Sequence, residues 1–400
     1  MSWHDSTLGE LAERDGGLIQ TGPFGSQLHQ SDYVSDGIPV IMPKDIADGR
    51  ISTESVARIA EETADRLERH KLKPRTIVLP RRGEVTKRAF IKADQEGWLC
   101  GTGCLKIELQ GKHLVPEFLY YFMEQSHVVQ WLVQHAVGTT MLNLSAGIVR
   151  NLPIRYPGIE VQSEIASILS AYDDLIENNR QRIALLEEMA RQLYREWFVR
   201  LRFPGYEHTR ITNGVPEKWA KKTLDELAGI TMGQSPESQY YNEVGDGLPF
   251  HQGVADFGDR FVTHRIYCTV QNRIAEADDI LCSVRAPVGR LNITLDKIVI
   301  GRGLAALRSM TGNQSLLFQQ LRAHFFKEDL IGAGAIFASV TKKEFEAQEI
   351  LNPPPQLANA FEEISCPIDE QLRILFQQNY QLRAARDLLL PRLMSGEIGV

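Results

Sequence analysis

The sequence has none of the segments that would place the protein in a membrane or outside the cell. Its 400 residues contain no apolar run near the roughly 18 residues that span a bilayer. Residues 1–15 are polar and acidic, unlike a signal peptide. Only five cysteines occur, at spacings that fit no zinc module, so we expect buried thiols in a reducing compartment. These absences predict a cytoplasmic protein without a bound metal.

Catalytic motifs are also missing. A phosphate-binding P-loop needs a lysine directly after its last glycine, but Gly25 is followed by Ser26 in the glycine-rich stretch 21–41. The run Asn-Pro-Pro-Pro at 352–355 lacks the aromatic residue of an amino-methyltransferase turn. The Gly-x-Gly pairs at 101–103 and 301–303 are too short for a dinucleotide or S-adenosylmethionine loop. The sequence therefore favours a binding protein with no catalytic residues.

Charge is distributed unevenly along the chain. The formal net charge of −7 argues against a protein that coats nucleic acid on its own. Between Arg66 and Lys92, however, ten lysines and arginines face only two acidic residues. This basic segment is either a solvated strand-and-turn surface or part of a site for phosphates.

The sequence repeats itself in order. Residues 3–12 (WHDSTLGELA) match residues 219–228 (WAKKTLDELA). SDGIPV, LCGTGCL and GTTMLNLS, starting at 35, 99 and 138, have counterparts in GDGLPF, VIGRGLA and GAIFASVT, starting at 245, 299 and 334. The offset shrinks from 216 to 196, as loop deletions in one scaffold would produce. Strands are predicted at 77–79, 105–109, 280–282 and 297–300, and a helix at 118–134.

Each repeat ends in a long helical pattern. Apolar residues alternate at spacings of three and four from Ile165 to Trp197 and again from Phe361 to Leu393. Because a second globule lies between them, the two helices are predicted to pack antiparallel. Asn179 and Asn379 sit near the middle of the two patterns. They are predicted to pair and fix the register, the alternative being that one or both face solvent.

These patterns predict an α+β fold with two repeated mixed α/β domains, separated by two long antiparallel coiled-coil helices with pseudo-two-fold symmetry. The expected boundaries are a first domain at 1–155, a first spacer helix at 159–201, a linker at 202–216, a second domain at 217–352 and a second spacer helix at 356–396.

Two related globules, held apart by a rigid pair of long helices, could each contact one part of a DNA site, with their centres about one DNA turn apart. About 36 helical residues extend roughly 54 Å, and one turn of DNA is roughly 34 to 36 Å. Arginine and lysine can bind phosphates or guanine edges, and glutamine can read adenine. The candidate DNA-binding residues are Lys44, Arg81, Arg82, Lys87, Arg88, Gln252, Arg260, Arg285 and Arg302. For each, the alternative is a solvated or ion-paired side chain.

The chain resembles the specificity subunits of type I restriction-modification systems over nearly its whole length. The resemblance rests on four segments: TGPFGSQL with the following DYV, GIPVI and PKDI (21–46), LNLSAGIVRNLPIRYPGIEVQSEIASIL (142–169), GVPEKWAKKTLDEL (214–227) and RDLLLPRLMSGEI (386–398). It implies two target recognition domains that read an asymmetric bipartite double-stranded DNA site. Two methyltransferase subunits with S-adenosylmethionine would methylate adenines, and two endonuclease/translocase subunits with ATP and Mg²⁺ would restrict DNA. This chain would carry no cofactor.

Two other readings stay open at this point. An autonomous DNA methyltransferase would bind S-adenosylmethionine as an isolated chain. A coiled-coil adaptor or decoy would not bind DNA selectively even with a methyltransferase partner.

Overall fold

The computed structural model describes residues 2–47, 49–139, 141–325 and 339–400. It divides into two compact units. Unit 1 contains Met1–Asn178 and Gln378–Val400, and unit 2 contains Asn179–Gln377. Within the repeat pair at 138–145 and 334–341, residue 140 and residues 334–338 lie outside the described residues. The last segment of the chain thus belongs to the same unit as the first.

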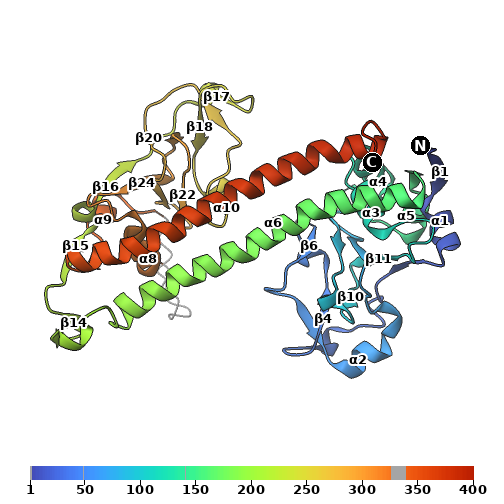
Figure 1. The fold of residues 1–400 in the computed structure, drawn as a ribbon, viewed down its shortest axis with the longest axis horizontal. Coiled ribbons are helices and arrows are strands. Elements are labelled where there is room, and N and C mark those ends of the chain that lie inside the picture. The colour runs from blue at the N-terminus through green and yellow to red at the C-terminus, as the bar shows by residue number, and fades with distance from the viewer. Residues whose placement is uncertain (1, 48, 140, 326–338) are drawn as a thin grey trace. The chain divides into compact units, whose positions relative to one another are not determined.

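Unit 1 contains two four-stranded sheets (Figure 1). The first, in the order β2-β11-β8-β9, is antiparallel and comprises Leu18–Thr21, Cys104–Glu108, Ile77–Pro80 and Ala89–Phe90. The second, in the order β10-β4-β7-β3, comprises Leu99–Cys100, Ile38–Ile41, Ala57–Ile59 and Tyr33–Val34. Its β4 and β10 pair in parallel. Two short ladders join β1 (His4–Thr7) to β12 (Pro153–Tyr156), and β5 (Ile46–Ala47) to β6 (Arg50–Ile51).

Unit 2 repeats this topology. Its antiparallel sheet β16-β24-β21-β22 comprises Ala228–Met232, Leu304–Ser309, Ile280–Ser283 and Leu291–Ile293. Its second sheet, β17-β19-β18-β23-β20, comprises Tyr241–Asn242, Tyr267–Cys268, Leu248–His251, Ile298–Ile300 and Ile274–Ala275. Again two strands, β18 and β23, pair in parallel. Strands β15 (Ala220–Thr223) and β25 (Glu349–Asn352) correspond to β1 and β12. The predicted repeat and all four predicted strands are confirmed, with ends shifted by one residue.

The same local chemistry starts the first helix of each unit. Thr7 precedes α1 (Leu8–Asp15), and Thr223 precedes α7 (Leu224–Leu227). Each threonine forms a capping box with the glutamate three residues later, Glu10 or Glu226. A capping box satisfies two backbone N–H groups that the first helical turn leaves free. The repeated TL-x-EL motif is therefore a helix start.

The shorter helices lie on the sheets. They are α2 (Glu61–Arg66), α3 (Pro116–Phe122), α4 (Ser126–His135) and α5 (Ala146–Arg150) in unit 1, and α8 (Gln314–Phe325) and α9 (Lys342–Glu346) in unit 2. The single helix predicted at 118–134 is wrong in one respect, because the chain breaks at 123–125 into α3 and α4. A hydrogen bond from the Val128 N–H to the Gln125 carbonyl begins the second helix. The segment 202–216 contains a small hairpin of β13 (Ile211–Thr212) and β14 (Val215–Pro216).

Two long helices complete the units. Helix α6 spans Ile159–Tyr194 and continues as a π-helical turn at Arg195–Val199, and α10 spans Pro355–Ser395. In unit 1 the beginning of α6 packs on the end of α10, with Ile165 and Leu393 in one core. In unit 2 the end of α6 packs on the beginning of α10, where the Tyr194 and Phe361 rings lie 6.2 Å apart. The antiparallel packing predicted from the sequence is confirmed within each unit.

Candidate nucleic-acid interface

A glycine turn follows β2 in unit 1 and β16 in unit 2. The Gly22 N–H donates to the Cys104 carbonyl at 2.9 Å, and the Gly233 N–H donates to the Leu304 carbonyl at 2.9 Å. A Cβ atom on Gly22 would lie 1.9 Å from the Gly101 carbonyl oxygen. Any side chain there would collide with backbone, so only glycine lets the two turns approach this closely. In unit 1 the glycine-rich stretch 21–41 is thus a packed turn followed by β4.

Arg82 and Arg285 occupy corresponding positions next to these turns. Arg82 lies two residues after the end of β8, and Arg285 lies two residues after the end of β21. Both side chains are exposed. Arg82 forms an isolated bridge with Asn143, and Arg285 forms one with Ser339. Two of the predicted candidates therefore occupy equivalent positions, each beyond the end of the equivalent strand in its own unit.

Lys44, Gln252 and Arg302 are also exposed near the glycine turns. The Lys44 ammonium donates to the Ser55 carbonyl at 3.0 Å. The Gln252 carbonyl accepts from the Gly303 N–H at 3.1 Å, which ties its backbone to the turn that carries Arg302. The structure brings Gln252, Arg285 and Arg302 to one edge in unit 2.

Arg81 lies against an aromatic ring that sequence reasoning missed. Its guanidinium carbon is 5.5 Å from the centre of the Phe24 ring, and that phenylalanine is 55% exposed. Arg81 Nε is buried and has no hydrogen-bond partner among the described residues. The available signal was a lone aromatic residue inside the turn Gly22-Pro23-Phe24-Gly25.

Five of the ten lysines and arginines in the basic segment 66–92 form ion pairs within unit 1. The ion pairs are Arg66–Asp32, Lys71–Asp65, Arg75–Glu117, Lys87–Glu84 and Arg88–Glu124. Lys87 pairs at the surface, where such contacts are weak and easily exchanged. Arg81 and Arg82 form no ion pair with a described residue; the contact of Arg81 with Phe24 and the place of Arg82 beside the end of β8 distinguish them within the segment.

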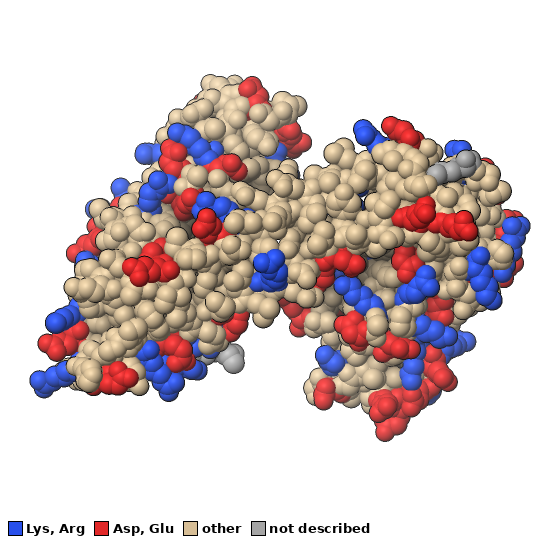
Figure 2. All heavy atoms as spheres, viewed as in Figure 1, with Lys and Arg blue, Asp and Glu red and all other residues tan. Residues whose placement is uncertain are grey.

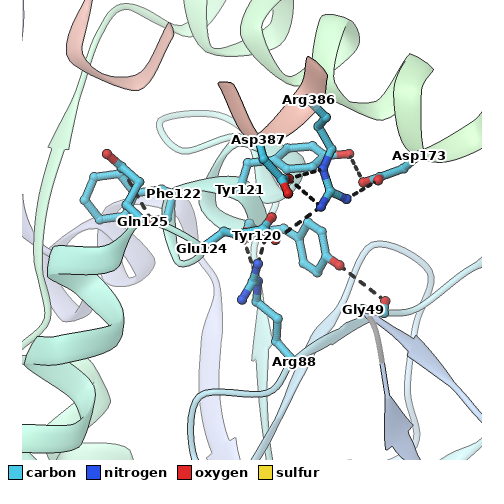
Figure 3. A network of polar contacts seen from close by, with 10 residues as sticks. All are labelled: Gly49, Arg88, Tyr120, Tyr121, Phe122, Glu124, Gln125, Asp173, Arg386 and Asp387. Carbon is cyan, nitrogen blue, oxygen red and sulfur yellow. Dashed lines mark hydrogen bonds and ion pairs between the residues drawn. The ribbon is translucent and has the colours of Figure 1, made fainter. Parts of the chain in front are cut away.

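Arg88 belongs to a polar network that fastens the long helices to unit 1 (Figure 3). It donates to the Tyr120 carbonyl at 3.0 Å and pairs with Glu124 at 2.9 Å. Arg386 of α10 pairs with the same Glu124 at 3.6 Å and with Asp173 of α6. Burial opposes the charge of Arg386, but Asp173 and Glu124 outweigh it and raise the pKa of that guanidinium. Arg88 therefore serves packing inside the unit.

Arg260 has a comparable place in unit 2. Its guanidinium pairs with Glu187 of α6 at 3.1 Å and with Asp369 of α10, and lies 4.1 Å from the centre of the Phe318 ring. Burial raises the pKa of the Asp369 carboxyl, and the charge of Arg260 opposes that rise. The Arg260 side chain is only 3% exposed. It holds the helices to the globule and leaves little surface for DNA.

Asn179 and Asn379 are both buried, each with 7% exposure. They belong to different units. Burial disfavours the solvent-facing alternative, and their pairing stays a prediction.

Charges of both signs are interleaved over the face drawn in Figure 2. Among the described residues, no cluster of three or more His, Cys, Asp or Glu side chains could bind a metal. No helix in the described part of the chain is long and apolar enough to cross a bilayer. The expectation of buried thiols is confirmed for four cysteines and wrong for Cys366, which is exposed.

Comparison with known proteins finds relatives of one kind. Residues 2–188 match the model of the type I restriction modification DNA specificity domain. A Methanocaldococcus jannaschii protein named as the MjaX type I restriction enzyme specificity subunit is 28% identical over 91% of this chain and 88% of its own length. The MjaIX specificity subunit of the same organism is 24% identical over 100% of this chain and 94% of its own.

A solved structure agrees on the fold. The S subunit of a type I restriction-modification system from M. genitalium superposes with a TM-score of 0.62 at 18% identity, over 98% of this chain and 96% of that one. The repeated topology, the two long helices and these relatives agree: over nearly its whole length the chain is similar to specificity subunits of type I restriction-modification systems.

Proposed function

We propose that this chain is a non-catalytic specificity subunit that reads an asymmetric, two-part site in double-stranded DNA, with one half-site for each unit. The observation that carries the proposal is a shared topology with different side chains at corresponding turns. Arg82 corresponds to Arg285, whereas Thr102 is replaced by Arg302 in the second copy. Because contacts to base edges set sequence preference, units that differ there should prefer different bases.

The chain would act with partners that supply the chemistry. Two methyltransferase subunits would methylate adenines with S-adenosylmethionine, and two endonuclease/translocase subunits would use ATP and Mg²⁺ to restrict unmodified DNA. The subunit would work in the cytoplasm, where it meets DNA. The mixed surface charge fits this division, because partner subunits would supply much of the surface that faces phosphates.

The list of DNA-binding residues is narrowed by the contacts within each unit. We propose Arg81, Arg82, Lys44, Gln252, Arg285 and Arg302 as the first choices, because their side chains reach solvent beside the glycine turns. Lys87 is a second choice, since its surface ion pair with Glu84 could open at little cost. Arg88 and Arg260 come last, because both are held by carboxylates inside their units.

Methylation mapping tests the proposal. The chain is expressed with its methyltransferase in a host that has no other adenine methylation, and methylated adenines are mapped across the genome. A two-part motif is expected, and exchanging residues 1–155 for a relative's first domain should change one half only. An uninterrupted motif, or a change in both halves, would contradict the proposal. Absence of methylation and of selective binding by the assembled complex would favour the adaptor reading.

The long helices provide a second test. We propose that they set the length of the unread spacer. Adding one heptad to each helix adds about 10 Å, which is about three base pairs of DNA at roughly 3.4 Å each. The spacer in the mapped motif should lengthen while both half-sites keep their bases. An unchanged spacer would contradict this role of the helices.

A further inference from the structure

Phe24 is held outward by a rigid turn. Its N–H donates to the Gln27 side-chain oxygen at 3.1 Å, and its carbonyl accepts from the Gln27 N–H at 2.8 Å and the Leu28 N–H at 3.2 Å. Gly22 and Pro23 before it are buried. The residue is nevertheless 55% exposed. The turn thus displays a large apolar surface in a fixed position.

Arg81 is equally well anchored. Its N–H donates to the Gly103 carbonyl at 2.7 Å, and its carbonyl accepts from the Leu144 N–H at 2.8 Å. The guanidinium rests near the Phe24 ring, and its buried Nε has no hydrogen-bond partner among the described residues. Cation–π contact orients the planar group, and its remaining donors are free to bind a ligand.

Unit 2 offers neither group at the corresponding positions. Gly22 and Gly233 make equivalent backbone hydrogen bonds in the two units. Two residues after each glycine, Phe24 corresponds to Ser235. Counted from the ends of β8 and β21, Arg81 corresponds to Val284. The Ser235 hydroxyl accepts from the Arg302 N–H at 3.2 Å, and Val284 is 3% exposed. The two units therefore have the same backbone at these positions but different side chains.

We propose that Phe24 and Arg81 together make the base-reading contact that distinguishes the half-site of unit 1 from that of unit 2. This inference rests on the proposed function and names a specificity-determining pair for it. The ligand would be a guanine beside a thymine in the major groove. The arginine fork matches guanine O6 and N7, and the apolar ring suits the thymine methyl group. Arg82 and its counterpart Arg285 would each bind a backbone phosphate at the equivalent position of their own half-site.

The test uses the specificity subunit assembled with its methyltransferase. Binding is measured by competition against a panel in which each base pair of the first half-site is replaced in turn. Arg81→Val should reduce discrimination about tenfold or more at one position, a loss within the range of a bidentate base contact. Phe24→Ser should do so at a neighbouring thymine. Discrimination in the second half-site should not change.

Thymine and uracil separate the two roles. Replacing the neighbouring thymine by uracil removes only the methyl group, so it should weaken binding of the wild-type complex and not of Phe24→Ser. Arg81→Lys keeps the charge and loses the fork, so it should lose discrimination while keeping the salt dependence. Circular dichroism and urea unfolding of each variant verify that unit 1 remains folded.

Two results would overturn the inference. If Arg81→Val kept the full base-preference profile of the first half-site, the pair would not read bases. If it weakened all sequences equally and lowered the salt dependence, Arg81 would be a phosphate contact. Either result leaves the proposed function intact. A wild-type complex without any sequence preference would instead defeat the proposed function itself.

Discussion

The two units fasten their long helices with the same kinds of charge in exchanged places. In unit 1 the arginine is on a helix, since Arg386 of α10 reaches Asp173 of α6 and Glu124 of the globule. In unit 2 the arginine is in the globule, and Arg260 reaches acids on both helices. Each unit thus joins its helices to its globule through an arginine paired with acidic residues. The repeated fold keeps this kind of ion-pair junction although the arginine stands on a helix in one unit and in the globule in the other.

The two junctions differ in burial. The Arg386 side chain is 18% exposed and the Arg260 side chain is 3% exposed. Desolvated charges cost much when one partner is lost, whereas charges near water are screened. The junction of unit 2 should therefore be the more vulnerable of the two.

Substituting Arg260 and Arg386 should change the free energy of unfolding more than any other variant proposed for this chain, and it tests whether burial makes the two junctions differ. Arg260→Ala leaves Glu187 and Asp369 without their shared arginine and should lower the free energy of unfolding by about 3 to 5 kcal/mol. Arg386→Ala should cost less, on the order of 2 kcal/mol, because water reaches its partners. Urea unfolding at pH 7 measures both. Arg265→Ala, at an exposed ion pair, is the control and should cost under about 1 kcal/mol. Equal losses for Arg260 and Arg386 would contradict the argument from burial.

Acid should weaken both units through buried histidines. Burial, helped by His264 and opposed by Asp256, lowers the pKa of His251 to about 4. In the unfolded chain this imidazole binds a proton below about pH 6.5, so the native state binds fewer protons in that window. Its contribution to stability is therefore lost as pH falls from about 6.5 to about 4, by roughly 3 kcal/mol at most. His251→Gln should flatten the pH dependence of the free energy of unfolding in this window.

Unit 1 has its own buried histidine for comparison. Burial, with Arg69 and Lys106, lowers the pKa of His70 to about 4. His70→Gln should remove a further part of the same acid sensitivity. A pH dependence that persists between pH 6.5 and 4 in the double variant would show that other groups dominate.

The turns at Gly22 and Gly233 are built alike in the two units, so substitutions there should have similar effects in both. Gly22→Ala and Gly233→Ala place a Cβ 1.9 Å and 2.1 Å from a carbonyl oxygen, so each should lower the free energy of unfolding by about 1 to 3 kcal/mol. Gly25 and Gly253 have nothing within 4 Å of such a Cβ, and their alanine variants are the controls. Urea unfolding compares the four. A marked cost in one unit alone would show that the two turns are not equivalent.

Arg82→Ala and Arg285→Ala should have the smallest and most similar effects. If each arginine meets one phosphate, each variant of the assembled complex should lower the slope of log affinity against log salt by about 0.9. Titrations at several salt concentrations measure the slope. A change confined to one base position would instead assign that arginine to base reading.

Sequence periodicity predicted the long helices, the repeat and the four strands, because these depend on local apolar patterns. The break between α3 and α4 escaped it, since 118–134 contains no proline or glycine that marks a boundary. Composition also drew attention to the basic segment 66–92. Half of its positive charges are paired, two of them with Asp32 and Glu117, which are distant in sequence and come close only through folding.

The candidate DNA-binding residues show the same limit. Arg88 and Arg260 resembled Arg82 in the sequence, but partners up to 109 residues away bury them. Phe24 was passed over because a hydrophobic residue in a sequence is expected to be buried. Its exposure follows from contacts formed on folding: Gly22 packs against Gly101, and hydrogen bonds with Gln27 and Leu28 fix the turn.

The division of the chain into units has a consequence for its synthesis. The core of unit 1 includes Leu390, Leu393 and Met394, whereas unit 2 needs nothing beyond Gln377. A ribosome makes the chain from its first residue to its last. Unit 2, although encoded later, can close while the last turns of α10 are still inside the ribosome tunnel. Unit 1 must wait for them, so its nascent apolar surface is the one that chaperones would meet.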